Sequence, residues 1–469
     1  MKIENDLGRD DIKKLVLRIA IPSMLAQFVN VLYSIVDRMF IGNIPVIGEQ
    51  ALAGAGICGP IVTLITSFAT LVGIGGAPLL SIRLGAKDEK GARQILANCF
   101  IMLLVLSILI PILVLTTKSG LLRAFGASDV TYPYADEYMT VYVMGAVFAL
   151  ISAGMNQFLI CQGYAKRGMI SVMIGAVTNI VLDPVFIFVF NMGVAGAAIA
   201  TVISQAVSSA YILYYLFSPK VPIRITFGGY RIRVMKRILM YGLSPFIIIA
   251  FDSLLIIGMN VTLKLYGGSE GDMYITCATI MQSFFLMITM PLGGITGGTQ
   301  SILGYNFGAG NVERIRQALR VIAALCLLFN GIMMVAAFTA SPFFVRLFTS
   351  NEEYAELSVW AIKMSVLGLI PLALQYSFVD AFTGMGLPTS ALPLSFMRKF
   401  NYFLLLFLLP MIWGARTIFY VEPIVDVIAG IITTIVFLSK INKILNKRKL
   451  EAEAEAQLEE DSKKMQKIQ

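Results

Sequence analysis

The sequence predicts an all-α membrane protein of about twelve transmembrane helices, in two six-helix lobes related by a pseudo-two-fold axis along the membrane normal. Of its 469 residues, 57% are hydrophobic and only 14% are charged, too few charges to cover a soluble domain of this length. Apolar runs of about 20 residues, the length that spans a bilayer, fill the sequence almost end to end. The two halves also match each other at one fixed offset.

The apolar runs are long enough to leave no room for a separate soluble domain. The polar start, MKIENDLGRDDIKK, does not look like a cleavable signal peptide, so the first helix itself is expected to direct insertion. The runs predict helices at about 14–41, 52–80, 94–116, 137–162, 168–190, 194–218, 238–265, 273–302, 317–341, 356–384, 390–413 and 417–440.

The net charge of +9 follows this topology. Most Lys and Arg fall in alternate connections, whereas the other connections hold only Lys118, Arg123, Lys264, Arg346 and Arg416. By the positive-inside rule the basic connections and both termini lie on the cytoplasmic side of the plasma membrane. The basic excess thus implies contact with anionic lipid headgroups and does not indicate nucleic-acid binding. The basic connections are those at Lys13–Lys14, Arg83–Arg93, Lys166–Arg167, Lys220–Arg237, Arg314–Arg320 and Lys440–Lys449.

Two residue types limit the chemistry. The chain has no histidine, which excludes imidazole bases, histidine metal sites and histidine proton relays. The five cysteines lie in apolar segments without CxxC spacing, which favours small buried side chains over disulfides or metal ligands. We expect no metal beyond a possible sodium ion, and no cofactor.

A shift of 223 residues, as from Pro22 to Pro245, brings landmarks of the two halves into register from the first helix to the loop after the fourth. Gly85-Ala86 meets Gly308-Ala309, Arg93-Gln94 meets Arg316-Gln317, and Gly163 meets Gly386. The repeat predicts an N-terminal lobe at 1–218, a cytoplasmic linker at 219–237, a C-terminal lobe at 238–440 and a charged, solvated helical tail at 441–469.

Acids within the helices are functional candidates, because a carboxylate at the membrane centre costs about 2.5–3.5 kcal/mol. In the N-terminal half, Asn179 and Asp183 share a helix face, and Pro184 frees a carbonyl beside the acid. Asp37 lies at a similar depth, and two carboxylates with amide and hydroxyl neighbours suit a proton or a sodium ion. Thr201 is a further candidate, as is Asn156, although counting places Asn156 deeper.

Structural alternatives remain for this group. Asp37 precedes Arg38 and would then form only an interfacial ion pair, and Asp183 would only bond a neighbouring helix. Under the repeat, Asp37 meets Asn260 and Asp183 meets Leu406, so the two halves carry different polar chemistry.

A second group lies in the C-terminal half. Tyr376 and Asp380 are spaced i, i+4, and Asp252 and Asp426 lie on other helices. Arg398 and Lys399 are possible counter-charges. An acid paired with Arg398 would be a buried structural contact; the alternatives are ion coupling and substrate contact.

Several segments resemble the multidrug and toxic compound extrusion (MATE) family over about residues 10–445, in particular its MepA-like and DinF-like bacterial branch. The segments are Asp37-Arg-Met-Phe-Ile-Gly, Asn179-Ile-Val-Leu-Asp183-Pro184-Val-Phe-Ile-Phe, Gly196-Ala-Ala-Ile-Ala-Thr201-Val-Ile-Ser-Gln, Arg83-Leu-Gly-Ala-Lys and Tyr305-Asn-Phe-Gly-Ala-Gly.

This resemblance implies a proton- or sodium-coupled antiporter that exports amphipathic, often cationic drugs by alternating access, and so contributes to antibiotic resistance. A monomer is expected. It also implies a cation network at Asp37, Asn156, Asn179, Asp183 and Thr201. A NorM-like branch uses acids similar to Asp252, Tyr376 and Asp380, so the resemblance leaves the coupling lobe open. Pro22 is the hinge candidate in the first helix, or else a proline tolerated in a membrane helix.

Other function classes fit less well. A lipid-linked saccharide flippase of the same superfamily would need a cationic cavity, whereas the intramembrane charges here are mainly acidic. A membrane-embedded enzyme without histidine would need an aspartyl dyad, and Asp37 and Asp183 lack the flanking glycines of one. A channel does not need two lobes with unlike polar sites. The prediction is therefore a transporter and not an enzyme.

Overall fold

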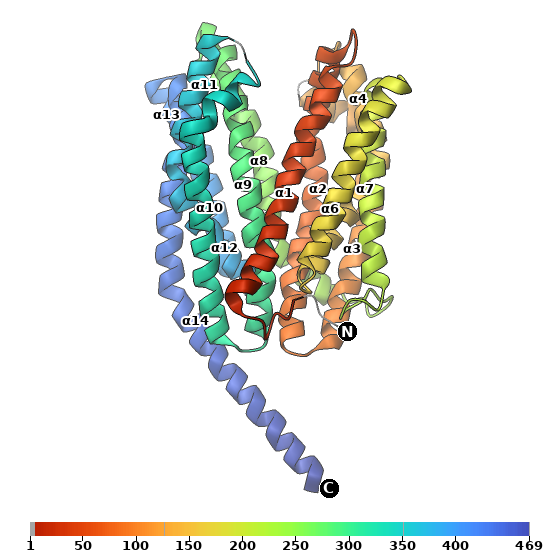
Figure 1. The fold of residues 1–469 in the computed structure, drawn as a ribbon, viewed down its shortest axis with the longest axis vertical. Helices are drawn as coiled ribbons and strands as arrows, with labels where there is room; N and C mark the ends of the chain where they lie inside the picture. The colour runs from red at the N-terminus through yellow and green to blue at the C-terminus, as the bar shows by residue number, and fades with distance from the viewer. Residues whose placement is uncertain (1–4, 126, 350, 469) are drawn as a thin grey trace.

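The computed structural model describes residues 5–125, 127–349 and 351–468. These residues form fourteen α-helices and no strand, in two side-by-side bundles (Figure 1). The first bundle, the N-lobe, contains α1 (Ile12–Gly42), α2 (Gly48–Gly85), α3 (Glu89–Ala124), α4 (Tyr132–Met144), α5 (Ala146–Ile160), α6 (Ala165–Pro184) and α7 (Gly193–Phe217). The second, the C-lobe, contains α8 (Ile232–Tyr266), α9 (Gly271–Gly308), α10 (Val312–Arg346), α11 (Glu352–Ser365), α12 (Leu369–Gly384), α13 (Pro388–Trp413) and α14 (Val421–Ile468).

The number of membrane spans agrees with the sequence. Within the described residues, 11 helices are long and apolar enough to span a membrane, and counting the bent pair α4–α5 as one span gives up to 12. The predicted helix at 137–162 is wrong in one respect, because α4 and α5 meet at an angle of 57°. Gly145 lies at this break, where a β-carbon would come within 2.3 Å of Val202 in α7. A glycine there allows the close approach and also weakens the helix.

The repeat is visible in matching details of the two lobes. A 3₁₀ turn at Val366–Gly368 separates α11 from α12, and Gly368 is the counterpart of Gly145. Gly163 and Gly386 are also counterparts, and both adopt a positive φ, 91° and 73°, which favours glycine. The agreement extends to backbone conformation, which supports two copies of one helical unit.

Several helices extend beyond the apolar runs that predicted them. The runs at 94–116 and 317–341 correspond to α3 and α10, which begin at Glu89 and Val312. The additional turns start at capping residues. Asp88 accepts a hydrogen bond from the amide of Gly91 at 2.8 Å, and its counterpart Asn311 accepts one from the amide of Arg314 at 3.4 Å.

Both chain ends and the connections rich in Lys and Arg lie at one end of the bundle, here called the basic end (Figure 1). The lobes contact each other closely there, at backbone crossings that glycine permits. A β-carbon on Gly85 would lie 1.8 Å from the carbonyl oxygen of Tyr305, and one on Gly308 would lie 1.9 Å from that of Ile82. These two contacts are pseudo-symmetric, because Ile82 and Tyr305 are also counterparts.

The hydrophobic cores interlock at this end as well. The first half of α1, including Leu15 and Ile19, packs in the core of the C-lobe, while Ile238 of α8 packs in the core of the N-lobe. The first helix of each lobe therefore packs partly against the other lobe. In particular, α1 contacts both α6 of the N-lobe and α9 of the C-lobe.

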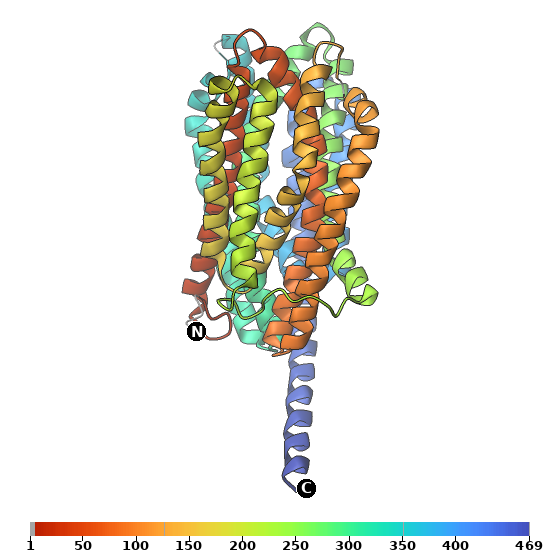
Figure 2. The same cartoon turned by 90° about the vertical axis from the view of Figure 1, so that its right-hand side faces the viewer.

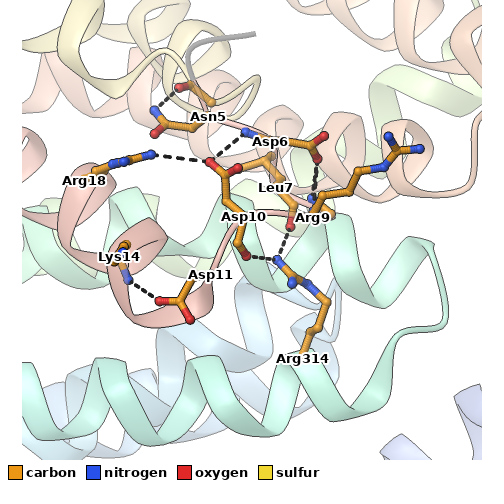
Figure 3. A network of polar contacts seen from close by, with 11 residues as sticks. Asn5, Asp6, Leu7, Arg9, Asp10, Asp11, Lys14, Arg18 and Arg314 are labelled. Carbon is orange, nitrogen blue, oxygen red and sulfur yellow. Dashed lines mark hydrogen bonds and ion pairs between the residues drawn. The ribbon is translucent and has the colours of Figure 1, made fainter.

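The segment before α1 bridges both lobes (Figure 3). Asn5 donates its amide to the carbonyl of Gly163 in the N-lobe at 2.7 Å. Arg314 of α10 in the C-lobe donates to the carbonyls of Leu7 and Asp10 at 3.2 and 2.8 Å. Asn306 of α9 also donates to the Leu7 carbonyl, at 3.0 Å. This segment thus joins α5–α6 to α9–α10 at the basic end.

Candidate functional site

The strongest candidate site is built on the end of α6. Asn179 and Asp183 are 1% and 0% exposed, and the amide nitrogen of Asn179 donates to the Asp183 carboxylate at 3.1 Å. The helix changes to a π-helical turn, Val185–Val189, directly after Pro184. Proline cannot donate a helical hydrogen bond, and such turns often accompany functional sites. The predicted shared face of Asn179 and Asp183 is thus present in the structure.

Asp37 of α1 meets this pair. Its carboxyl group is close enough to that of Asp183 for the two charges to interact. No described side chain donates a hydrogen bond to Asp37 Oδ1 or Asp183 Oδ2, although both oxygens are buried. The charge of Arg38 also acts on Asp37. The Arg38 side chain is nevertheless exposed, and no ion pair among the described residues includes it, so an Asp37–Arg38 ion pair is not formed.

Thr201 completes the group from α7, and Asn156 does not join it. The Asn179 amide lies 3.4 Å from the hydroxyl oxygen of Thr201. Asn156 lies beside Gly168 instead, about three helical turns away from Asn179 along α6. Because α5 and α6 form an antiparallel hairpin, a residue near the end of α5 faces the beginning of α6. The inclusion of Asn156 in one cluster with Asp183 is therefore corrected.

Two tyrosines near Asp37, and a tyrosine–glutamine pair beside them, were not predicted from the sequence. Tyr33 and Tyr138 lie close enough to interact with its charge, and Tyr142 neighbours Gln205 of α7. Tyr138 and Tyr142 are one helical turn apart in α4, with stacked rings. This i, i+4 spacing was the available signal, but it also occurs in ordinary helix packing.

The oxygens of the site suit a proton or a hard monovalent cation. Asn179 Oδ1 is a third buried oxygen without a donor, beside those of Asp37 and Asp183. The described part of the chain has no group of three or more His, Cys, Asp or Glu side chains of the kind that a transition metal would need. Carboxylate and amide oxygens without nearby donors are instead the ligands that sodium or a shared proton would use.

The C-lobe acids differ from Asp37 and Asp183, because most of them form an ion pair with an arginine or a lysine. Arg398 of α13 donates Nε to Asp426 of α14 at 2.9 Å, and Nη2 to Glu422 at 2.9 Å. All three groups are largely buried. The expected contact between Arg398 and an acid is present. Glu422 was missed, although its i, i+4 spacing to Asp426 could have indicated it.

Lys399 forms an ion pair with Asp252 of α8. The lysine side chain is 8% exposed and the aspartate side chain 46%, so the pair lies at the edge of the buried network. Asp380 is separate from it: its carboxyl group lies near Thr296 and Gln300 of α9, and Tyr376 lies one turn earlier on α12. Of the predicted C-lobe acids, Asp252 and Asp426 are therefore ion-paired, whereas Asp380 has neutral side chains as its neighbours.

Pro22 lies inside α1, next to Ser23, where α1 crosses α9. A β-carbon on Gly294 would lie 2.6 Å from the Ser23 carbonyl. The hinge candidate thus lies at the crossing of the two lobes.

The chain is similar to known membrane transport proteins over most of its length. The MatE family model matches residues 22–185 and 249–398, more than half of the chain. The multidrug export proteins MepA of Staphylococcus haemolyticus and of Staphylococcus aureus strain MSSA476 are each 22% identical to it. The alignments cover 92% of this chain and 94% of the first relative, and 86% and 88% for the second.

Solved structures agree. A MOP superfamily transporter from Pyrococcus furiosus has a TM-score of 0.87 and 25% identity, with 95% of this chain and 99% of that chain covered. A MATE structure in the bent conformation has a TM-score of 0.86 and 25% identity, with 94% and 98% covered. The chain is therefore a multi-pass membrane protein that belongs to the MatE family.

Proposed function

We propose that this protein is a cation-coupled antiporter that exports amphipathic, often cationic compounds by alternating access. The observation that carries the proposal is the proximity of the Asp37 and Asp183 carboxyl groups, which form no ion pair among the described residues and have buried oxygens without a hydrogen-bond donor. Two such carboxylates repel each other unless a proton or sodium ion neutralises them. The site would therefore take up a cation on one side of the membrane and release it on the other.

The position of α1 provides a route from the ion to the lobes. Asp37 lies near one end of α1, and the Ser23–Gly294 crossing lies in its other half. A change of charge at Asp37 alters the contact between α1 and α6, and α1 also packs against α9. We infer that ion occupancy biases the relative position of the lobes through this helix, with Pro22 as the point of bending.

The cargo follows from the charge of the buried side chains. Arg398 and Lys399 are both paired with acids, so neither offers a free cationic site to an anionic headgroup. Asp380 lacks a basic partner among the described residues. This favours a cationic cargo over the lipid-linked saccharide of a flippase, the alternative function. The related MepA proteins, named for multidrug export, support the same choice.

Orientation and state complete the proposal. The basic end faces the cytoplasm of a bacterial cell, as the positive-inside rule requires, with both termini there. The protein acts as a monomer and uses no cofactor other than the coupling ion.

Reconstitution in liposomes tests this function. Purified protein is incorporated into vesicles, and efflux of ethidium is followed while a pH gradient or a sodium gradient is imposed separately. We expect one gradient to drive efflux and the other to have little effect, which also identifies the ion. If neither gradient drives ethidium or another cation, the antiporter proposal fails, and flipping of an anionic lipid becomes the function to test.

A further inference from the structure

A groove of about 630 Å³ lies between α10 and α14 at the basic end of the C-lobe. Arg316 and Arg320 of α10 lie on one wall, and Asn442 and Asn446 of α14 lie on the other. Each pair has i, i+4 spacing, so both members face the groove from one side of their helix. Four donor groups therefore converge on it.

The two arginines have no acidic partner within the described part of the chain, where neither takes part in an ion pair or side-chain hydrogen bond. Two acids of the tail that the structure describes form ion pairs elsewhere. Glu451 contacts Lys447 and Arg448, and Glu455 contacts Arg448. The positive charge at the groove is thus available to a ligand.

The groove continues into an apolar part toward the membrane. Phe437 and Leu438 of α14 line it on the membrane side of Asn442 and Asn446, and Leu438 is 61% exposed. A ligand with an anionic head and hydrocarbon chains matches this order of residues. Basic pockets between membrane helices near the headgroup level are the usual form of such sites.

The pseudo-symmetric groove of the N-lobe shows what the C-lobe lacks. There the inter-lobe linker crosses between α3 and α7 (Figure 2). Gln94 donates to the carbonyl of Gly229 at 2.9 Å, and the amide of Arg231 donates to Asn98 at 3.0 Å. The Phe227 ring stacks on Phe217 of α7. The linker thus closes the groove.

Within the residues that the structure describes, no corresponding segment closes the C-lobe groove. Beyond the groove, α14 itself continues straight away from the bundle (Figure 1). Arg93, the counterpart of Arg316, forms an ion pair with Glu89 at 3.0 Å, whereas Arg316 has none. The inter-lobe linker therefore fills the space between α3 and α7 in the N-lobe. The corresponding space between α10 and α14 in the C-lobe is open and lined by basic side chains.

We propose that an anionic glycerophospholipid binds in this C-lobe groove, with its phosphodiester between Arg316 and Arg320. Guanidinium groups form paired hydrogen bonds to phosphate oxygens. Asn442 and Asn446 would bind the polar headgroup, and the acyl chains would lie along Phe437 and Leu438. The proposal is independent of the transported substrate and of the coupling ion.

Native mass spectrometry of the delipidated full-length protein tests the site. Phosphatidylglycerol is titrated against phosphatidylcholine with the same acyl chains. For the wild type we expect the first phosphatidylglycerol to bind about tenfold or more tightly than phosphatidylcholine. Arg316→Gln/Arg320→Gln should remove this preference. Arg93→Gln, the pseudo-symmetric control, should keep it.

The Arg316→Lys/Arg320→Lys variant is the control that distinguishes loss of the charges from misfolding. It keeps both charges, so it should retain a preference for the anionic lipid while binding it less tightly. Two results would overturn the proposal: equal affinity of the wild type for both lipids, or unchanged phosphatidylglycerol binding in the double Gln variant. Complete displacement of the lipid by millimolar inorganic phosphate would also overturn it, by showing a site for free anions.

Discussion

At the scale of single residues, the acids within the helices differ in whether they form an ion pair with a basic side chain. Asp426 and Asp252 form ion pairs with an arginine and a lysine, whereas no described ion pair includes Asp37 or Asp183. A buried acid with a fixed cation stays ionised and has little to exchange. Two neighbouring acids that form no ion pair repel each other unless a proton or another cation neutralises them. This contrast is the reason to place ion coupling in the N-lobe.

The Asp37–Asp183 pair predicts non-additive effects on transport. Asp37→Asn and Asp183→Asn should each reduce gradient-driven efflux by about 5- to 150-fold, the usual range of a coupling free energy. The double variant should be no worse than the poorer single one, because both changes remove one shared site. Initial efflux rates in vesicles of equal protein content measure this. Losses that multiply would indicate two independent roles.

Arg398 is expected to matter for folding first. Arg398→Gln leaves Asp426 and Glu422 buried without a cation, which should destabilise the protein by about 3–5 kcal/mol. Adding Asp426→Asn and Glu422→Gln to this variant should restore most of the stability. Thermal unfolding of the detergent-solubilised protein compares the variants. A stable Arg398→Gln single variant would contradict the structural role.

Residue patterns predicted the members of these groups better than their partners. All five intramembrane aspartates could be identified as acids within apolar runs. The shared face of Asn179 and Asp183 could be predicted because one helix fixes the spacing of these two residues. The pairing of Arg398 with both Asp426 and Glu422, and the separation of Asn156, depend on how neighbouring helices are aligned. Apolar sequences that bury helices on most sides carry little information about that alignment.

At the scale of elements, the segment before α1 is the least expected feature. Its sequence is polar and charged, yet the carbonyl of its Leu7 accepts hydrogen bonds from Asn306 and Arg314 of the C-lobe. The α4–α5 break and the capped ends of α3 and α10 were also outside the apolar pattern. Hydropathy locates the membrane-embedded part of a helix, whereas caps and contacts in the polar region decide where it ends.

Arg314→Ala should release this segment. The variant loses the hydrogen bonds to the carbonyls of Leu7 and Asp10, so the backbone amides of about residues 6–12 should exchange faster with deuterium. Hydrogen–deuterium exchange with peptide-level mass spectrometry measures the change. Arg93→Ala, on the other lobe, is the matched control and should leave these amides protected. Equal exchange in wild type and Arg314→Ala would show that the segment is held by other contacts.

At the scale of the whole molecule, the lobes are closed on each other at the basic end through pseudo-symmetric glycines. The contacts of Gly85 with Tyr305 and of Gly308 with Ile82 leave no space for a methyl group. The repeat predicted these glycines as landmarks. Their close contact across the lobes could not be read from one sequence, because the repeat relates the lobes without specifying the surface on which they meet.

Gly85→Ala/Gly308→Ala should therefore favour a conformation that is open at the basic end. Overpacking of about 1–3 kcal/mol per site is enough to shift a two-state equilibrium. Spin labels at Lys90 and Lys443, in a background with the native cysteines replaced, report the distance between the lobes. We expect longer distances than in the parent protein. Gly297→Ala in α9, where a β-carbon meets nothing within 4 Å, is the control and should not change them.

The most direct test of the central claim compares one acid from each lobe in the same efflux assay. Wild type, Asp183→Asn and Asp380→Asn are reconstituted at equal density, and ethidium efflux is driven by the gradient that the wild type uses. The account predicts that Asp183→Asn lowers the response to the gradient by about 5- to 150-fold, while Asp380→Asn keeps the wild-type response even if its affinity for ethidium falls. A gradient response that survives in Asp183→Asn and disappears in Asp380→Asn would contradict the account and place ion coupling in the C-lobe.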